Sequence, residues 1–167
     1  MAVHEQTPIE HRVISVLVEN RAGVLSHVVG LFSARGFNID SLAVGETEDP
    51  TMSRITLVAT GDQRTLEQVK KQLNKLIDVI KIQDLSEEGF VDRELMLMKM
   101  KNTAAHLKTL SELSAKYHLR VIEQGAKMLI VECTESRENT KTIFETLKRI
   151  GIEEIAQTGI VALSKKN

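Results

Sequence analysis

The chain has 167 residues, of which 42% are hydrophobic and 27% charged, and its formal net charge is −1. This composition is typical of a globular protein, and the near-neutral charge gives no reason to expect a nucleic-acid or acidic-membrane partner. No apolar run reaches the roughly twenty residues that span a bilayer, and the polar N-terminus is unlike a secretion signal, so we expect a cytoplasmic protein. The single cysteine, Cys133, cannot form an intramolecular disulfide and is predicted to lie in the core.

The first half of the chain predicts the element order βαββαβ. Residues 1–10 show no periodicity and are expected to form a flexible arm. Further on, apolar residues alternate in some stretches, which predicts strands, and recur every three or four positions in others, which predicts helices. The predicted elements are strand 13–18, a helix from Val24 that stops at Gly36, strand 38–44, strand 52–60, helix 66–77 and strand 79–85.

The second half repeats this order after a short linker at residues 86–90. The predicted elements are strand 94–101, helix 107–117, strand 120–124, strand 128–133, helix 143–150 and strand 155–164. Met96, Met98 and Met100 share one face of their strand, which indicates core packing or, alternatively, an adaptable surface. Two βαββαβ units, at 11–85 and 91–167, predict an α+β protein of two ferredoxin-like sheets in tandem, each with its helices on one face.

The loop between the first strand and the first helix has the chemistry of a ligand site. The first N–H groups of a helix lack internal partners and carry partial positive charge, so they suit a carboxylate. Gly23 lets a ligand approach the backbone, and Asn20 offers both donor and acceptor groups, which suits a free amino acid. A polar turn with Asn and Gly is nevertheless most often only a turn, and spacing alone favours that interpretation.

The residues that would support catalysis or metal binding are missing from the sequence. The five histidines stand singly, without a second His or Cys at ligand spacing: His4, His11, His27, His106 and His118. There is no P-loop, no dinucleotide fingerprint, no glycine-rich acyl-phosphatase loop and no pattern of aromatic residues for stacking RNA bases. We therefore expect no catalytic residue and no metal site.

Four segments of the chain resemble the regulatory small subunit of acetolactate synthase. They are Glu19–Ser26, Gly30–Leu42, Ser53–Thr56 and, at the end, Thr158–Ser164. That family opens with an ACT domain, a βαββαβ module that commonly binds amino acids. The resemblance implies a non-catalytic subunit that activates a separate catalytic large subunit and confers feedback inhibition by a branched-chain amino acid, valine being the family's usual effector. It also implies that thiamine diphosphate, magnesium and FAD belong to the catalytic partner and not to this chain.

Two alternatives stand beside this interpretation. One is a stand-alone, amino-acid-sensing ACT module that regulates another partner, and a more distant one is a small hydrolase on the same fold. Capture of a large thiamine-dependent chain would support the first interpretation, and turnover by the isolated protein would support the hydrolase.

The resemblance places the effector between two chains of a homodimer. The loop of one chain would face the start of strand 38–44 of the other, with the helix-start amides holding the carboxylate. That strand is expected at a sheet edge and lacks Lys or Pro, so a second copy can pair with it. The predicted effector-binding residues are Asn20, Ala22, Gly23, Val24, Leu25, Asn38 and Ile39. The contact with the large subunit would use another surface, either the exposed sheet face of the first unit or the second unit with its methionine face.

Overall fold

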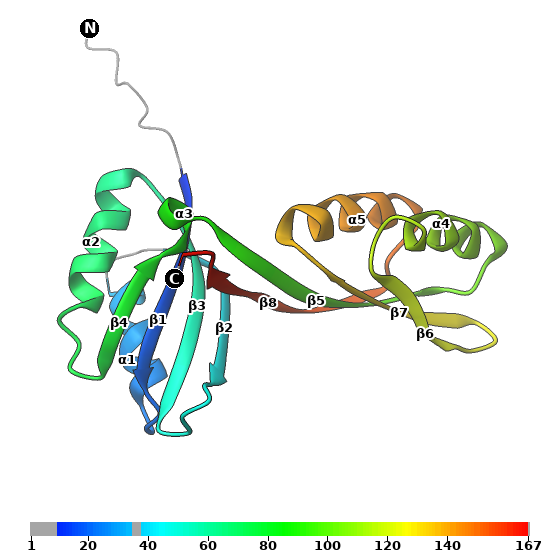
Figure 1. The fold of residues 1–167 in the computed structure, drawn as a ribbon. Helices are drawn as coiled ribbons and strands as arrows, with labels where there is room; N and C mark the ends of the chain where they lie inside the picture. Colours follow the sequence, from blue (N-terminus) through cyan, green and yellow to red (C-terminus); the bar gives the residue numbers. More distant parts are fainter. Residues whose placement is uncertain (1–9, 35–37, 167) are drawn as a thin grey trace, which may run out of the picture. The chain divides into compact units, whose positions relative to one another are not determined.

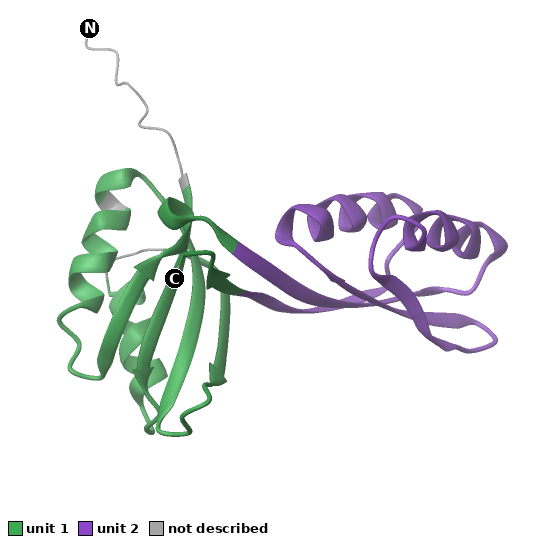
Figure 2. Ribbon diagram, viewed as in Figure 1, with its two compact units in different colours: residues 1–90, 162–167 green, residues 91–161 purple. Residues whose placement is uncertain are grey.

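The computed structural model describes residues 10–34 and 38–166 of the chain (Figure 1). Most of the predicted arm at 1–10, and the helix stop at Gly36, lie outside the described residues. The chain divides into two compact units, residues 1–90 with 162–167 and residues 91–161 (Figure 2). Each unit contains a four-stranded antiparallel sheet with helices, which confirms the predicted α+β fold of two ferredoxin-like units.

The first unit follows the predicted order and has the sheet order β2-β3-β1-β4. The elements are β1 (Glu10–Glu19), α1 (Val24–Ser33), β2 (Asn38–Glu46), β3 (Met52–Gly61), α2 (Gln63–Leu73), β4 (Val79–Asp84) and α3 (Leu85–Glu88). Helices α1 and α2 lie on the same side of the sheet (Figure 1). Strand β2 has β3 as its neighbour on one side and forms an edge of the sheet, as the sequence predicted.

The core of the first unit lies between the sheet and these two helices. Ile14, Val16 and Val18 alternate along β1 with exposures of 0–2% and pack with the buried stripe of α1. The opposite face of β1 is also buried at Val13 and Ser15. On the sheet face that we expected to be exposed, these two residues of β1 are therefore buried, whereas Leu17 is half-buried and His11 exposed.

The second unit has the sheet order β6-β7-β5-β8. Its elements are β5 (Phe90–Lys101), α4 (Ala104–Ser114), β6 (Leu119–Gln124), β7 (Met128–Glu135), α5 (Arg137–Ile150) and β8 (Glu154–Ser164), of which residues from Ala162 onward count with the first unit. Met96, Met98 and Met100 are all fully buried, so the methionine face is core and the alternative of an adaptable surface is wrong. Cys133 is buried too, and burial, with the nearby carboxylates of Glu135 and Glu94, raises the pKa of its thiol to about 11.

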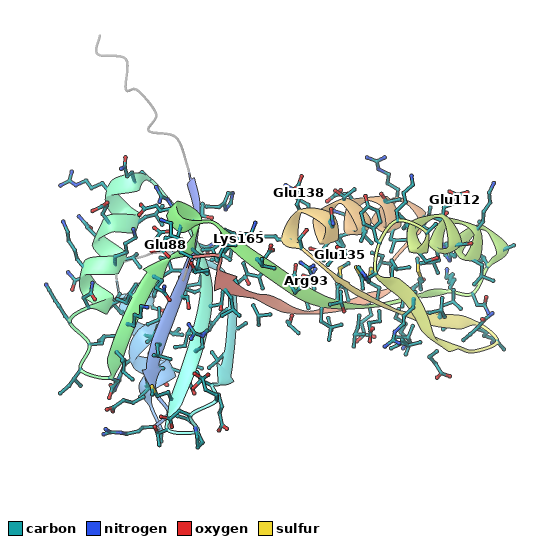
Figure 3. The ribbon with its side chains drawn as sticks, viewed as in Figure 1. Glu88, Arg93, Glu112, Glu135, Glu138 and Lys165 are labelled. Carbon is teal, nitrogen blue, oxygen red and sulfur yellow. The ribbon has the colours of Figure 1, made fainter. Side chains whose placement is uncertain are left out.

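Helix α3 occupies the stretch that the sequence indicated as a linker. The carboxylate of Asp84 accepts the backbone N–H of Ser86 at 3.1 Å and so caps the helix, and Gly89, with φ +77°, ends it. The C-terminal segment returns to this point, because Lys165 N donates to Gly89 O at 3.0 Å and Ser164 Oγ to Glu88 Oε2 at 3.2 Å (Figure 3). The connection out of the first unit is thus an ordered, capped element.

The described part of the chain contains neither a helix that could span a membrane nor a cluster of side chains that could bind a metal ion. No helix among residues 10–34 and 38–166 is both long and apolar enough to cross a membrane. The described residues also contain no group of three or more His, Cys, Asp or Glu side chains that could hold a metal ion.

Candidate effector site

The connection from β1 to α1 forms a polar corner at one end of the first sheet. Gly23 is the N-cap residue of α1 and has φ +89°, a left-handed conformation that L side chains rarely adopt. A Cβ atom at this position would meet nothing within 4 Å. Glycine is thus required here by the backbone conformation, and the space beside it is open to a ligand.

Helix α1 begins without a side-chain cap, unlike α4 and α5. The hydroxyls of Thr103 and Ser136 accept N–H groups of the first turns of α4 and α5. At the start of α1, no acceptor among the described residues takes the backbone N–H groups of Ala22, Gly23 and Leu25. Three donors and the positive end of the helix dipole therefore remain available for an anionic group.

Asn20 is held firmly against the turn that joins β2 to β3. Its backbone N–H donates to Thr51 O at 2.7 Å, and its side-chain Nδ2 donates to Pro50 O at 2.9 Å and to Glu46 Oε1 at 3.1 Å. The carbonyl oxygen Oδ1 is the group of this side chain that remains for a ligand.

Apolar surface at this corner comes from Leu25, which is 41% exposed. Val24, which the sequence placed beside it in the pocket, is 4% exposed because its side chain packs in the core of the first unit. The backbone N–H of Val24 donates to Arg21 O at 3.4 Å. Val24 thus anchors the start of α1, while its neighbour Leu25 presents a side chain to solvent.

Asn38 and Ile39 lie at the opposite end of the same sheet. Asn38 pairs with Thr60 of β3, whereas the end of β1 that leads to Asn20 pairs with Met52 of β3. Eight residues of strand separate these two positions, which is about 27 Å. A single chain therefore does not bring the two halves of the predicted site together.

Charged side chains surround the corner. Arg21 pairs with Glu19 at 2.5 Å, and the ring of His27 lies 3.1 Å from the carboxylate of Asp78. Asp78 O also accepts the backbone N–H of Glu19 at 3.0 Å, which fastens the connection before β4 to the end of β1. These contacts fix the corner from both sides and leave its glycine exposed.

Two participants at this corner, Glu46 and Pro50, were missed by sequence reasoning. They are 26 and 30 residues from Asn20, and the polar stretch that contains them indicated only a turn. The one signal available was the β2–β3 hairpin, since the antiparallel register returns its turn to the end of β1.

A separate hollow of about 480 Å³ lies in the second unit, away from the predicted residues. It is lined by Ser114, Tyr117, His118, Leu119, Arg120, Glu132 and Thr134. The Arg120 guanidinium in this hollow is paired with Glu132 at 2.9 Å, and His118 lies 2.9 Å from the carboxylate of Glu135.

Family comparisons agree with the fold of both units. Residues 14–81 match the model of the AHAS small subunit-like ACT domain, and residues 93–166 match the model of the small subunit of acetolactate synthase. The chain belongs to the acetolactate synthase small-subunit family. The resemblance drawn from the sequence is thereby confirmed, and the first unit is the family's ACT domain.

Individual members of the family match along nearly the whole chain. The acetolactate synthase small subunit of Buchnera aphidicola is 38% identical over 157 residues, which are 93% of this chain and 99% of the relative. That of Mycolicibacterium smegmatis is 44% identical over 152 residues, 91% of this chain and 89% of the relative. The crystal structure of the small subunit from Thermotoga maritima has a TM-score of 0.82 and 35% identity, and the match covers 95% of this chain and 99% of that one.

Proposed function

We propose that this chain is the regulatory subunit of acetolactate synthase, which activates a catalytic large subunit and makes it subject to feedback inhibition by a branched-chain amino acid, with valine as the effector. Family membership supports the role, and the corner at Gly23 supports the ligand. The observation that carries the proposal is the start of α1, where three backbone N–H groups stand without acceptors among the described residues. Asn20, three residues before the N-cap Gly23, adds a carbonyl oxygen that has no donor among the described residues.

The effector site is completed by a second copy of the chain. In a homodimer with two β2 strands side by side, the corner of one chain would meet Asn38 and Ile39 of the other. The edge position of β2 supports this arrangement, as do its apolar composition and the 46% exposure of Val44. The separation of the two halves within one chain is a further argument for it, since neither half alone encloses a ligand.

The catalytic chemistry belongs to the large subunit. We propose that thiamine diphosphate, magnesium and FAD are bound there, and that the complex works in the cytoplasm. This chain then binds the effector, and its contact with the large subunit makes the activity of that subunit depend on whether the effector is bound.

Substitution of Gly23 tests the proposed site. Gly23→Asp puts a negative charge where the effector's carboxylate would lie, and valine binding measured by calorimetry on the full chain should be lost. Gly23→Asn is the matched control, because Asn is similar in size, carries no charge and tolerates positive φ better than most residues. It should bind valine more weakly than the wild type but measurably. Asn38→Ala should also weaken binding, since it removes the polar group of the other half. Wild-type affinity in both Gly23→Asp and Asn38→Ala would show that the site lies elsewhere.

A further inference from the structure

The orientation of the Asn20 carboxamide is determined by its surroundings. Both groups that it touches, the carbonyl of Pro50 and the carboxylate of Glu46, are acceptors, at 2.9 and 3.1 Å. The reversed carboxamide would set its oxygen against two oxygens, so the NH₂ group must face them. Both N–H bonds of Nδ2 are then used, and Asn20 meets a ligand only as a hydrogen-bond acceptor.

The second unit has a corresponding asparagine, Asn102, with no carboxylate among its described contacts. Asn102 follows β5 as Asn20 follows β1. It donates its backbone N–H to Lys127 O and its Nδ2 to Gly125 O, both at 2.8 Å. Among the described contacts of Asn102 there is no acid. An asparagine bonded to turn carbonyls is thus sufficient to fasten the hairpin, and Glu46 is an addition specific to the first unit.

We propose that Glu46 is a specificity-determining residue of the effector site: it holds Asn20 so that Oδ1 accepts a hydrogen bond from the ammonium group of the bound amino acid. The inference rests on the proposed function: that proposal places the carboxylate of the amino acid, and this one places its ammonium group. An amino acid carries its carboxylate and its ammonium on one carbon. The amides at the start of α1 bind the carboxylate, and Asn20, three residues before the helix N-cap Gly23, is the neighbouring acceptor.

The charge of Glu46 acts in the same direction. A carboxylate 3.1 Å from Nδ2 polarises the carboxamide, which makes Oδ1 a better acceptor for a cation. Without Glu46, the carboxamide keeps one bond, to Pro50 O, and its orientation is held less firmly. An effector without an ammonium group gains nothing from Asn20 and should be indifferent to Glu46.

The test is calorimetry of the full-length chain with valine and with 3-methylbutanoate, which is valine without its ammonium group. Glu46→Ala should lower the affinity for valine about tenfold, the effect of one hydrogen bond to a charged group, and leave the affinity for 3-methylbutanoate unchanged. Glu46→Gln keeps an oxygen acceptor and should retain most of the valine affinity. Glu48→Ala is the matched control, because it removes an exposed acid from the same turn, and it should bind valine like the wild type. Glu46 is exposed, so its variants are expected to fold.

The outcomes separate this inference from the proposed function. Absence of valine binding by the wild-type chain would overturn both. Valine binding that is lost in Gly23→Asp but equal in Glu46→Ala and Glu48→Ala would keep the site and overturn the role of Glu46. Equal losses in Glu46→Gln and Glu46→Ala, or a parallel loss for 3-methylbutanoate, would also overturn the role of Glu46 in orienting Asn20.

Discussion

The buried carboxylate of Glu135 forms hydrogen bonds with two segments of the second unit, one before β6 and one at the start of α5. One oxygen accepts a hydrogen bond from the backbone N–H of His118 at 2.8 Å and lies 2.9 Å from Nδ1 of the His118 ring. The other oxygen accepts a hydrogen bond from Nδ2 of Asn139 at 3.0 Å. Burial alone would raise the pKa of this carboxyl, but these hydrogen bonds and the charge of His118 lower it from 4.5 to about 2. The charged form therefore holds the start of β6 against the start of α5.

This gives the stability of the second unit a defined dependence on pH. Because the folded pKa lies below the unfolded value of 4.5, the contribution of Glu135 is complete above about pH 5 and disappears as the pH falls towards 2. Glu135→Gln should cost roughly 2–3 kcal/mol at pH 7 and much less at pH 3. Urea unfolding at both pH values measures the difference. Glu138→Gln, which changes an exposed acid in the first turn of the adjacent helix α5, is the control (Figure 3). A cost of Glu135→Gln that is equal at both pH values would contradict the assignment.

Local chemistry in the sequence predicts some residues of the effector corner and not others. Asn20 and Gly23 follow from turn chemistry, because the residue types required there are few. The side chain of Val24 could not be assigned in the same way, since a residue at the start of an amphipathic helix faces either the core or the loop. The contact of Glu46 with Asn20 could not be predicted from the sequence, because it depends on the β2–β3 hairpin and not on any local pattern.

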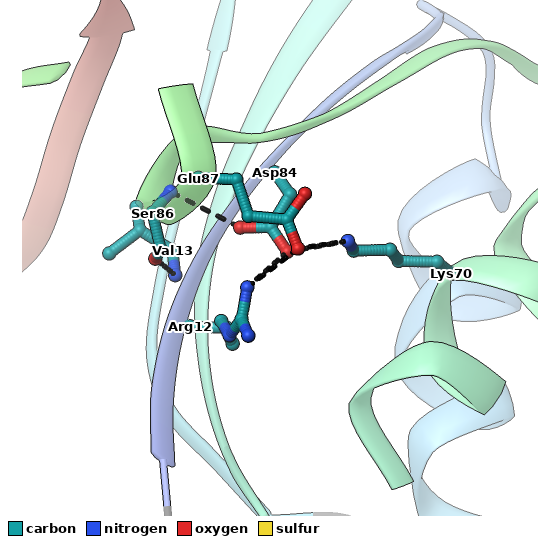
Figure 4. Close-up of polar contacts among 6 residues, drawn as sticks. All are labelled: Arg12, Val13, Lys70, Asp84, Ser86 and Glu87. Carbon is teal, nitrogen blue, oxygen red and sulfur yellow. Dashed lines mark hydrogen bonds and ion pairs between the residues drawn. The ribbon is translucent and has the colours of Figure 1, made fainter. Parts of the chain in front are cut away.

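At the scale of the element, helix α3 is fixed by a network of four charges (Figure 4). Lys70 of α2 lies 2.6 Å from Asp84 and 3.4 Å from Glu87, and Arg12 of β1 lies 3.3 and 2.8 Å from the same two carboxylates. Burial opposes the charge of Lys70, but Asp84 and Glu87 raise its pKa, and the hydrogen bond from Arg12 is the main cause that lowers the pKa of Glu87. Ser86 Oγ also accepts the N–H of Val13 at 2.8 Å.

Asp84 is the centre of this network, and its removal should have a large effect. Its side chain is 6% exposed, and it caps α3 while facing two cations. Asp84→Ala should therefore lower the free energy of unfolding by about 2–4 kcal/mol, because two partly buried cations lose their inner partner and a helix loses its cap. Urea unfolding measures this. Glu87→Ala removes the exposed acid of the network and should cost far less. Similar costs in the two variants would show that the network does not depend on the buried acid.

The boundaries of helices and strands could be predicted from the sequence where buried residues recur at a regular spacing. The alternation of Ile14, Val16 and Val18 determines β1, and the methionines of β5 determine its inward face. Ile77 was assigned to the buried stripe of a helix, yet α2 ends at Leu73 and Ile77 is 95% exposed. The apolar period continued past the last turn, so periodicity alone could not show where the helix stops. The short helix α3 within the predicted linker was missed for a related reason, since a four-residue helix leaves no period to detect.

At the scale of the whole molecule, two copies of one fold have different helix starts. In the second unit the hydroxyl of Thr103 caps α4 by accepting the backbone N–H of His106, so one donor of the first turn is satisfied by a side chain. In the first unit Gly23 provides no such cap. The two sequences differ at this point, since the first unit has Asn20 and Gly23 before its helix and the second unit has Asn102 and Thr103. The uncapped helix start of the first unit supports the proposal that effector recognition belongs to this unit.

An effector bound at the first unit changes the activity of another chain only by the difference between its affinities for two arrangements of the complex. Such coupling is typically about 1–3 kcal/mol, or roughly 5–150-fold in an equilibrium. That range is sufficient to move an enzyme between mostly active and mostly inhibited states. If the proposed effector site and the contact with the large subunit are distinct surfaces, substitutions should separate their effects.

Asn20→Ala should bind and activate the large subunit as the wild type does while losing inhibition by valine. The reason is that Asn20 is exposed and, in the proposed site, would contribute an acceptor to the ligand, whereas the core of the first unit is formed by other residues. The measurement is a titration of the variant into the catalytic chain with and without valine. Asn102→Ala removes the corresponding asparagine of the second unit, with its bond to Gly125 O, and should keep valine inhibition. This control accounts for any effect of loosening a hairpin. Parallel loss of activation and inhibition in Asn20→Ala would show that one surface serves both roles, because a separate effector corner would leave activation intact.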